Sequence, residues 1–179
     1  MNETRKSDSA GIWRLQALAA VILLTCAANP TQLVAETQAS DATALQVAQA
    51  FMGALGDGDM ETLRGLMADD MVWHNEGDSR IPWIGPWLGK QAILEEFLPA
   101  FGSGAQAKMW SVEHASETDN EAAMTGRMSL LLTNSGVETG PTSWAVRVRV
   151  RNGQVTLWHW FEDSLLISRA FHGENGSKE

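Results

Sequence analysis

The feature that most constrains the fold is a change in hydrophobic period near Lys108. Before this point apolar residues recur at the spacing of amphipathic helices, and after it apolar and polar residues alternate. The alternation predicts four β-strands, each with one buried face, at residues 108–117, 121–133, 142–151 and 154–163. Asn-Gly after the third segment is a strong signal for a tight hairpin. Helices followed by a meander of strands predict an α+β domain.

The helical part of the chain comes first. Residues 41–56 and 60–67 carry apolar side chains at helical spacing and are separated by a turn rich in glycine and aspartate. A third helix before the strands and a short helix after them are predicted at residues 89–101 and 164–171.

The N-terminus has the three parts of a secretory signal peptide. Basic residues precede an apolar run, and the small residues Cys26-Ala27-Ala28 follow it. We therefore expect a signal peptide at residues 1–28, with cleavage after Ala28 or as late as Ala35, and export to the periplasm or the cell exterior. The apolar run is shorter than the roughly 20 residues that span a membrane, so no stable membrane span is expected after cleavage. An uncleaved anchor is the alternative.

Cleavage would leave residues 29–40 as a polar linker, 41–171 as the folded domain and 172–179 as a polar tail. The only cysteine, Cys26, lies in the leader, so the mature domain would have no thiol for a disulfide, for covalent catalysis or for a metal. Thr25 before Cys26 matches a lipoprotein box poorly, and lipoprotein anchoring through Cys26 is therefore not expected.

Composition excludes several classes of partner and mechanism. The formal net charge is −9 and the isoelectric point is about 4.9, whereas nucleic acids and anionic membranes are bound by basic surfaces. We therefore expect no nucleic-acid partner. Tyrosine is absent, which excludes any mechanism that needs a phenol as acid or hydrogen-bond donor.

A tryptophan-rich loop locates a candidate binding site. A strand carrying Trp73, His74 and Asn75 leads into a loop that contains Trp83 and Trp87, each preceded by a proline. Proline stiffens a loop, and rigid aromatic side chains at a pocket mouth can act as a lid. The same residues also suit a plug that closes the end of the fold.

This region and the end of the last strand carry a family resemblance. The motifs are Trp73-His74, Pro82-Trp83-Ile84-Gly85, Leu88-Gly89-Lys90 and Phe161-Glu162-Asp163-Ser164. Together with the order of helices and strands, they resemble the SnoaL-like, ketosteroid-isomerase-like branch of the nuclear-transport-factor-2-like superfamily over residues 41–171. The resemblance implies a cone-shaped, curved antiparallel sheet wrapped around the N-terminal helices, with a pocket open at one end.

The resemblance also implies that known chemistry of the family is incomplete in this chain. Asn75 stands where ketosteroid isomerases hold their Asp general base, and an amide cannot accept the proton. Ser129 and Trp160 stand where epoxide hydrolases hold two Asp residues, and Trp160 also replaces the Asp base of the cyclases. Arg127 does match the arginine of the hydrolases.

We expect the remaining polar and aromatic side chains to share the concave face of the sheet, because alternate residues of a strand point the same way. The predicted substrate-binding residues are Trp73, Asn75, Arg127, Ser129, Trp158 and Trp160 from the strands, and Trp83 and Trp87 from the loop. Such a pocket suits a small apolar molecule with a polar or anionic end. The alternative is an ordinary core with satisfied polar groups, in which Arg127 pairs with Glu162.

The candidate catalytic residues are His74, Asn75, Arg127 and Asp163, of which Asn75 and Arg127 would polarise an oxygen. Two functions remain open: an exported, cofactor-independent lyase, isomerase or hydrolase, and a non-catalytic binding or accessory domain. A carboxylate or imidazole that projects into the cavity would favour the enzyme, and a filled cone would favour a purely structural domain.

The convex face raises two further hypotheses. His74 and His159 should point there, and with Glu76 or Asp78 they could hold a metal. No HxH or HxxxH spacing supports this, so we expect no metal and no cofactor. Arginines alternate along residues 147–151, and they either face acidic residues of a second subunit, in a homodimer through the convex sheet face, or are solvated.

Overall fold

A computed structural model describes residues 42–174. The elements in chain order are α1 Ala44–Asp57, α2 Met60–Leu66, β1 Met67–Asn75, β2 Gly85–Leu88, α3 Lys90–Ala92, η1 Ile93–Phe97 (a π-helical turn), α4 Leu98–Gly104, β3 Ala105–Glu117, β4 Glu121–Leu132, β5 Val137–Glu138, β6 Thr142–Arg151, β7 Gln154–Glu162 and α5 Ser164–Phe171. The predicted signal peptide, the predicted linker and most of the polar tail lie outside the described residues. Across 42–174, no helix is both long and apolar enough to cross a membrane.

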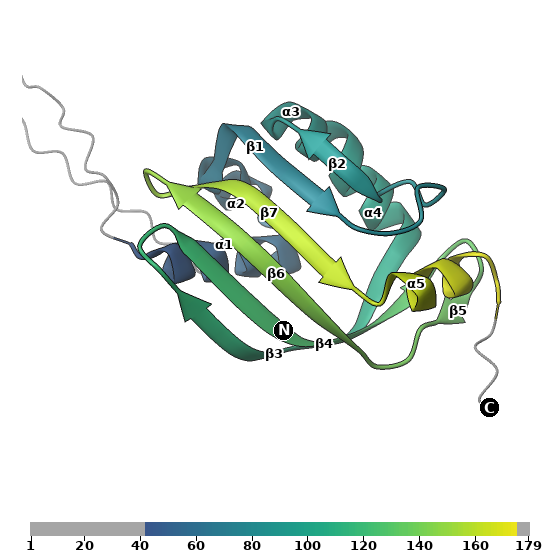
Figure 1. The fold of residues 1–179 in the computed structure, drawn as a ribbon. Helices are drawn as coiled ribbons and strands as arrows, with labels where there is room; N and C mark the ends of the chain where they lie inside the picture. Colours follow the sequence, from purple (N-terminus) through teal and green to yellow (C-terminus); the bar gives the residue numbers. More distant parts are fainter. Residues whose placement is uncertain (1–41, 175–179) are drawn as a thin grey trace, which may run out of the picture. The chain divides into compact units, whose positions relative to one another are not determined.

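The strands of this described part form one sheet in the order β2-β1-β7-β6-β4-β3, with β5 paired to β4. The sheet curls around α1, which contacts β3, β4, β6 and β7 (Figure 1). The predicted α+β cone is confirmed with one difference. β1 and β7 run parallel while the other pairs run antiparallel, so the sheet is mixed. A parallel pair needs a long connection, and here the chain from β2 to β6 connects β1 to β7.

Local sequence signals explain where α1 begins and ends. The Thr43 hydroxyl accepts a hydrogen bond from the backbone N–H of Gln46, and the Gln46 side chain accepts one from the backbone N–H of Thr43. Gly58 ends the helix in the left-handed conformation, with a φ of 69°. The helix buries Val47 and Phe51 against the inner face of the sheet, which places its side chains at the centre of the fold.

The structure adds two short strands to the predicted elements. β2 lies within the segment predicted as a loop and pairs antiparallel with β1, with Trp87 opposite Trp73. β5 follows the turn at residues 133–136 and pairs with the end of β4. β5 has two residues and β2 has four, which is at or below the shortest stretch in which alternation can be recognised, so sequence periodicity does not reveal them.

The arginine row on β6 has acidic partners in the same chain. Arg147 and Arg149 both contact Glu121, at 2.6 and 2.8 Å, and Arg151 contacts Asp70 at 2.7 Å. These pairs balance the row without a second subunit. The homodimer through the convex face therefore stays a prediction that this row does not support.

Candidate functional site

A cavity of about 750 Å³ lies between α1 and the inner face of the sheet. Its walls are mainly apolar, and the aromatic lining residues are Trp73, Trp83, Phe97, Phe101, Trp110, Trp158 and Trp160. The lining residues with amide or carboxyl side chains are Gln49, Asp57, Asn75 and Glu162. The cone is therefore not filled by its own side chains, which argues against a purely structural domain.

Trp73 lies at the centre of the aromatic wall. Its ring centroid is 4.5 Å from that of Phe97, 5.5 Å from that of Trp158 and 5.9 Å from that of Phe51. Trp73 and Trp158 are direct partners across the parallel β1–β7 pair, so the sheet itself sets their spacing. Contacts of this kind between aromatic rings add to the free energy gained by burial, and they hold the wall in a defined shape.

A second group of tryptophans leads from the cavity to the surface. The rings of Trp110, Trp144 and Trp160 are stacked, with centroids 4.7 to 5.5 Å apart. Trp144 is buried, whereas Trp110 on β3 is 43% exposed. This stack therefore offers a flat apolar surface at the edge of the cavity.

Asn75 connects the strand to the tryptophan-rich loop. Its Oδ1 accepts a hydrogen bond of 2.9 Å from Trp73 Nε1, and its Nδ2 donates one of 3.2 Å to the backbone carbonyl of Trp83. A carboxylate could accept the first bond but could not donate the second. An amide at this position therefore stabilises the architecture of the cavity, and Asn75 is the one predicted catalytic residue that lines it.

Trp83 and Trp87 differ in their surroundings. Trp83 is 1% exposed and packs edge-on against Phe101 and Phe171, with centroids 5.8 and 5.6 Å away. Trp87 is partly buried, packs near Phe97 and is not among the cavity-lining residues. Trp83 is thus a fixed wall, and its burial favours the plug over the lid.

Glu162 is a carboxyl group in the cavity that sequence reasoning did not place there. Burial raises its pKa to about 7, although a 3.0 Å hydrogen bond from Trp160 Nε1 opposes this shift, and the charge of Asp163 adds to it. The alternative in which Arg127 pairs with Glu162 is wrong, because Arg127 is exposed on the other face of the sheet and β6 lies between β4 and β7. Alternation along β7 is the signal that could have found this residue, since Trp158, Trp160 and Glu162 all line the cavity.

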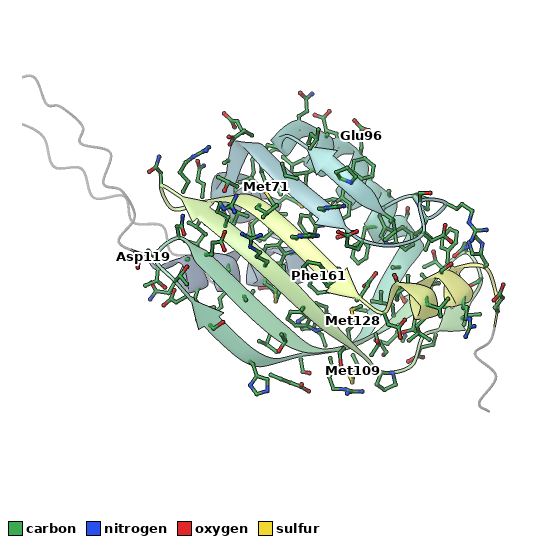
Figure 2. All side chains as sticks on the ribbon, in the orientation of Figure 1. Met71, Glu96, Met109, Asp119, Met128 and Phe161 are labelled. Atoms are coloured by element: carbon green, nitrogen blue, oxygen red, sulfur yellow. The ribbon has the colours of Figure 1, made fainter. Side chains whose placement is uncertain are left out.

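Arg127 and Ser129 do not face the cavity as predicted. Their neighbours Met124, Met128 and Leu130 line it instead (Figure 2 labels Met128 on β4). Arg127 is exposed, and the Ser129 hydroxyl donates a 3.3 Å hydrogen bond to Glu138 on β5. A shift of one residue along a strand moves every side chain to the other face of the sheet. The prediction for β4 was wrong by such a shift, because it placed the odd-numbered residues inside and the structure places the even-numbered ones there.

The two other predicted catalytic residues also lie outside the cavity. His74 projects from the opposite face of β1, beside His159. Asp163 caps the N-terminus of α5, where its Oδ1 accepts a 3.0 Å hydrogen bond from the backbone N–H of Leu166. Neither group can reach a molecule in the cavity from these positions.

We expect Asp163→Ala to lower the free energy of unfolding by about 1 kcal/mol through the loss of this cap. Asp163→Asn should retain most of the stability, because an asparagine oxygen can accept the same hydrogen bond. Urea denaturation of the two variants measures the difference. Equal losses in both variants would contradict the capping role.

Comparisons with known proteins agree with this geometry. Residues 48–158 match the model of the SnoaL-like domain family, and the chain belongs to that family. The structure is similar to an NTF2-like protein from Burkholderia xenovorans LB400, at 20% identity and a TM-score of 0.65, over 71% of this chain and 94% of that chain. A search of curated proteins found no significant match.

Two further solved structures are similar to the same extent. An NTF2-like protein from Burkholderia thailandensis E264 is 18% identical with a TM-score of 0.63, over 72% of this chain and 97% of that chain. TerC, which was co-crystallized with polyporic acid, is 19% identical with a TM-score of 0.61, over 72% of this chain and 97% of that chain. At these identities the similarity shows the fold alone.

Proposed function

We propose that the domain binds a small, largely apolar molecule in the aromatic cavity and that Glu162 transfers a proton to or from it. The observation that carries this proposal is a carboxyl group with a pKa of about 7 inside a tryptophan-lined cavity. A group whose pKa lies near the operating pH is well suited to general acid–base catalysis, because both of its protonation states are populated.

The lining indicates the chemistry of the ligand. Flat aromatic walls favour a planar apolar body. The acidic group of the ligand would lie beside Glu162, the carboxyl group that would accept or return its proton. We infer a planar molecule that carries a carbonyl group and, next to it, an acidic C–H bond. Cofactor-independent isomerisation, cyclisation and elimination are reactions of this kind.

Proton transfer can be detected before the reaction is known. A panel of planar hydrophobic ketones with a C–H bond next to the carbonyl would be tested for quenching of tryptophan fluorescence, and binders would then be incubated in D₂O. We expect the protein to promote deuterium exchange into a bound ligand. Glu162→Gln should bind comparably and lose about 10²–10⁴-fold in exchange rate, the usual contribution of an acid–base group. Asp57→Asn at the exposed rim of the cavity is the matched control and should retain the exchange.

A non-catalytic binding domain is the second candidate. Two observations favour it. The hydrogen bonds of Asn75 hold the strand and the loop together rather than a ligand. Glu162 is the one partly buried carboxyl group of the lining, so it has no second such group as an acid–base partner there. Binding without deuterium exchange in any ligand would select this candidate. A panel with no binder at all would count against both functions.

Export of the protein is also a proposal. It rests on the basic, apolar and small-residue segments of residues 1–28. N-terminal sequencing of the protein purified from its natural cells should begin after Ala28 or Ala35, and a chain that still begins at Met1 would contradict export by cleavage.

A further inference from the structure

The parallel β1–β7 pair places two histidines side by side on the outer face of the sheet. His74 and His159 are direct partners in the register, and their rings are stacked at 7° with centroids 4.7 Å apart. This separation matches the spacing of about 4.7–4.9 Å between neighbouring strands, so the two rings leave the sheet in the same direction, one on each strand. The strands that carry the rings hold them together.

A carboxylate completes the group. Glu76 follows the last residue of β1, and its Oε1 lies 2.9 Å from His159 Nε2 and 3.8 Å from His74 Nδ1. The three ligand atoms lie within 4.8 Å of one another. Bonds of about 2.0–2.2 Å to one ion separate neighbouring ligand atoms by roughly 3–3.5 Å. The observed distances surround that range. An imidazole nitrogen binds an ion in the plane of its ring, so at least one of the two rings, most readily His74, would turn out of the stacked arrangement for one ion to contact all three.

We propose that His74, His159 and Glu76 form a binding site for a divalent first-row transition metal ion such as Zn²⁺. Two imidazole nitrogens and one carboxylate oxygen are donors that such ions prefer. The side chains are 32%, 21% and 52% exposed, so the remaining coordination positions are open to water. An ion here would be exchangeable, unlike the enclosed ions of structural zinc sites.

The surroundings are compatible with a cation. Arg147 lies opposite His159 in the β6–β7 register, but its guanidinium is engaged by Glu121 at 2.6 Å, which offsets its charge. The ring of Phe161 packs against His159 at 4.1 Å and limits its rotation (Figure 2 labels Phe161 on β7). The expectation of no metal followed from local spacing alone, and here Glu76 and His159 are 83 residues apart in the chain.

The site lies on the opposite side of the sheet from the cavity. His74 alternates with Trp73 and Asn75, and His159 alternates with Trp158 and Trp160, all of which line the cavity. Metal binding is therefore independent of the proposed proton transfer, and each can be wrong without affecting the other.

The test is calorimetric titration of untagged, chelator-treated protein with Zn²⁺, repeated with Co²⁺ to record its absorption spectrum. We expect saturation at one ion per chain. His74→Ala, His159→Ala and Glu76→Gln should each weaken binding at least tenfold, since even the loss of an outer-shell partner costs about 10–100-fold. The chain has four histidines, so His114→Ala and His172→Ala are matched controls and should leave the affinity unchanged.

Glu76→Gln keeps the size of a half-exposed side chain, so it provides a test in a folded protein even where a histidine variant fails to fold. Circular dichroism of each variant checks the fold. Three outcomes would overturn the proposal: no saturable binding of either ion, equal weakening by a control substitution, or unchanged affinity in Glu76→Gln. In those cases His159 and Glu76 form a hydrogen bond and nothing more.

Discussion

Glu162→Gln should raise the free energy of unfolding by about 3 kcal/mol at about pH 8 and leave it nearly unchanged at about pH 4. Burial raises the pKa of this carboxyl group from 4.5 to about 7, and each unit corresponds to about 1.4 kcal/mol. The folded protein therefore keeps a proton that the unfolded chain releases. The contribution of the protonated Glu162 to the free energy of unfolding is therefore fully present below about pH 4.5 and is lost as the pH rises through about 7.

Glutamine removes the titration while its oxygen can still accept the hydrogen bond from Trp160 Nε1. Urea unfolding of the wild-type protein and the variant across this pH range measures the effect. Exposed Glu96 lies on η1, away from the cavity lining, and Glu96→Gln is the control that should show no such pH dependence (Figure 2). A stability difference that is constant with pH would mean that the Glu162 carboxyl is solvated, and its proposed role as an acid–base group would lose its support.

Gly126→Ala should destabilise the domain by about 3 kcal/mol, the upper end of the usual cost of overpacking. Gly126 on β4 lies opposite both Val112 on β3 and Trp144 on β6. A Cβ atom at this position would overlap the backbone carbonyl oxygen of Ser111 and come within 2.8 Å of the Trp144 ring. The carbonyl belongs to the neighbouring strand and cannot rotate away as the end of a side chain can.

Gly102→Ala is the matched control, because an added Cβ in this exposed part of α4 meets no atom within 4 Å. In a helix this substitution usually stabilises by about 0.5–1 kcal/mol. Thermal and urea unfolding of the two variants should therefore change in opposite directions. Similar stability in Gly126→Ala and the wild-type protein would show that β3 can move away from β4 at little cost.

Much of the fold could be predicted because its signals are local. The change of period located the four long strands to within a few residues. The Asn-Gly signal is confirmed by a hairpin between β6 and β7, in which Asn152 and Gly153 have φ values of 54° and 72°. The helix caps at Thr43 and Asp59 also depend only on neighbouring residues.

The candidate site was predicted less well, for two physical reasons. The inner face of β4 was assigned by family position, which put Arg127 and Ser129 inside, whereas the apolar alternation of Met124, Gly126 and Met128 marks the face that the structure buries. Glu162 entered only as an alternative partner of Arg127, because its neighbours in space were unknown. Burial raises the pKa of this carboxyl group, and the sequence alone does not show which carboxyl groups are buried.

The sequence by itself determined the long strands and the helices of this protein, their caps and turns, and its membership of the SnoaL-like family, because each depends on patterns within short stretches of chain. The tertiary structure decided that β1 and β7 pair in parallel. That pairing joins Trp73 and Asn75 to Trp158 and Trp160 in the cavity, and it places His74 against His159 on the other face. No local pattern encodes the partner, direction or register of two strands that lie far apart in the chain, because only the packing of the complete fold selects them.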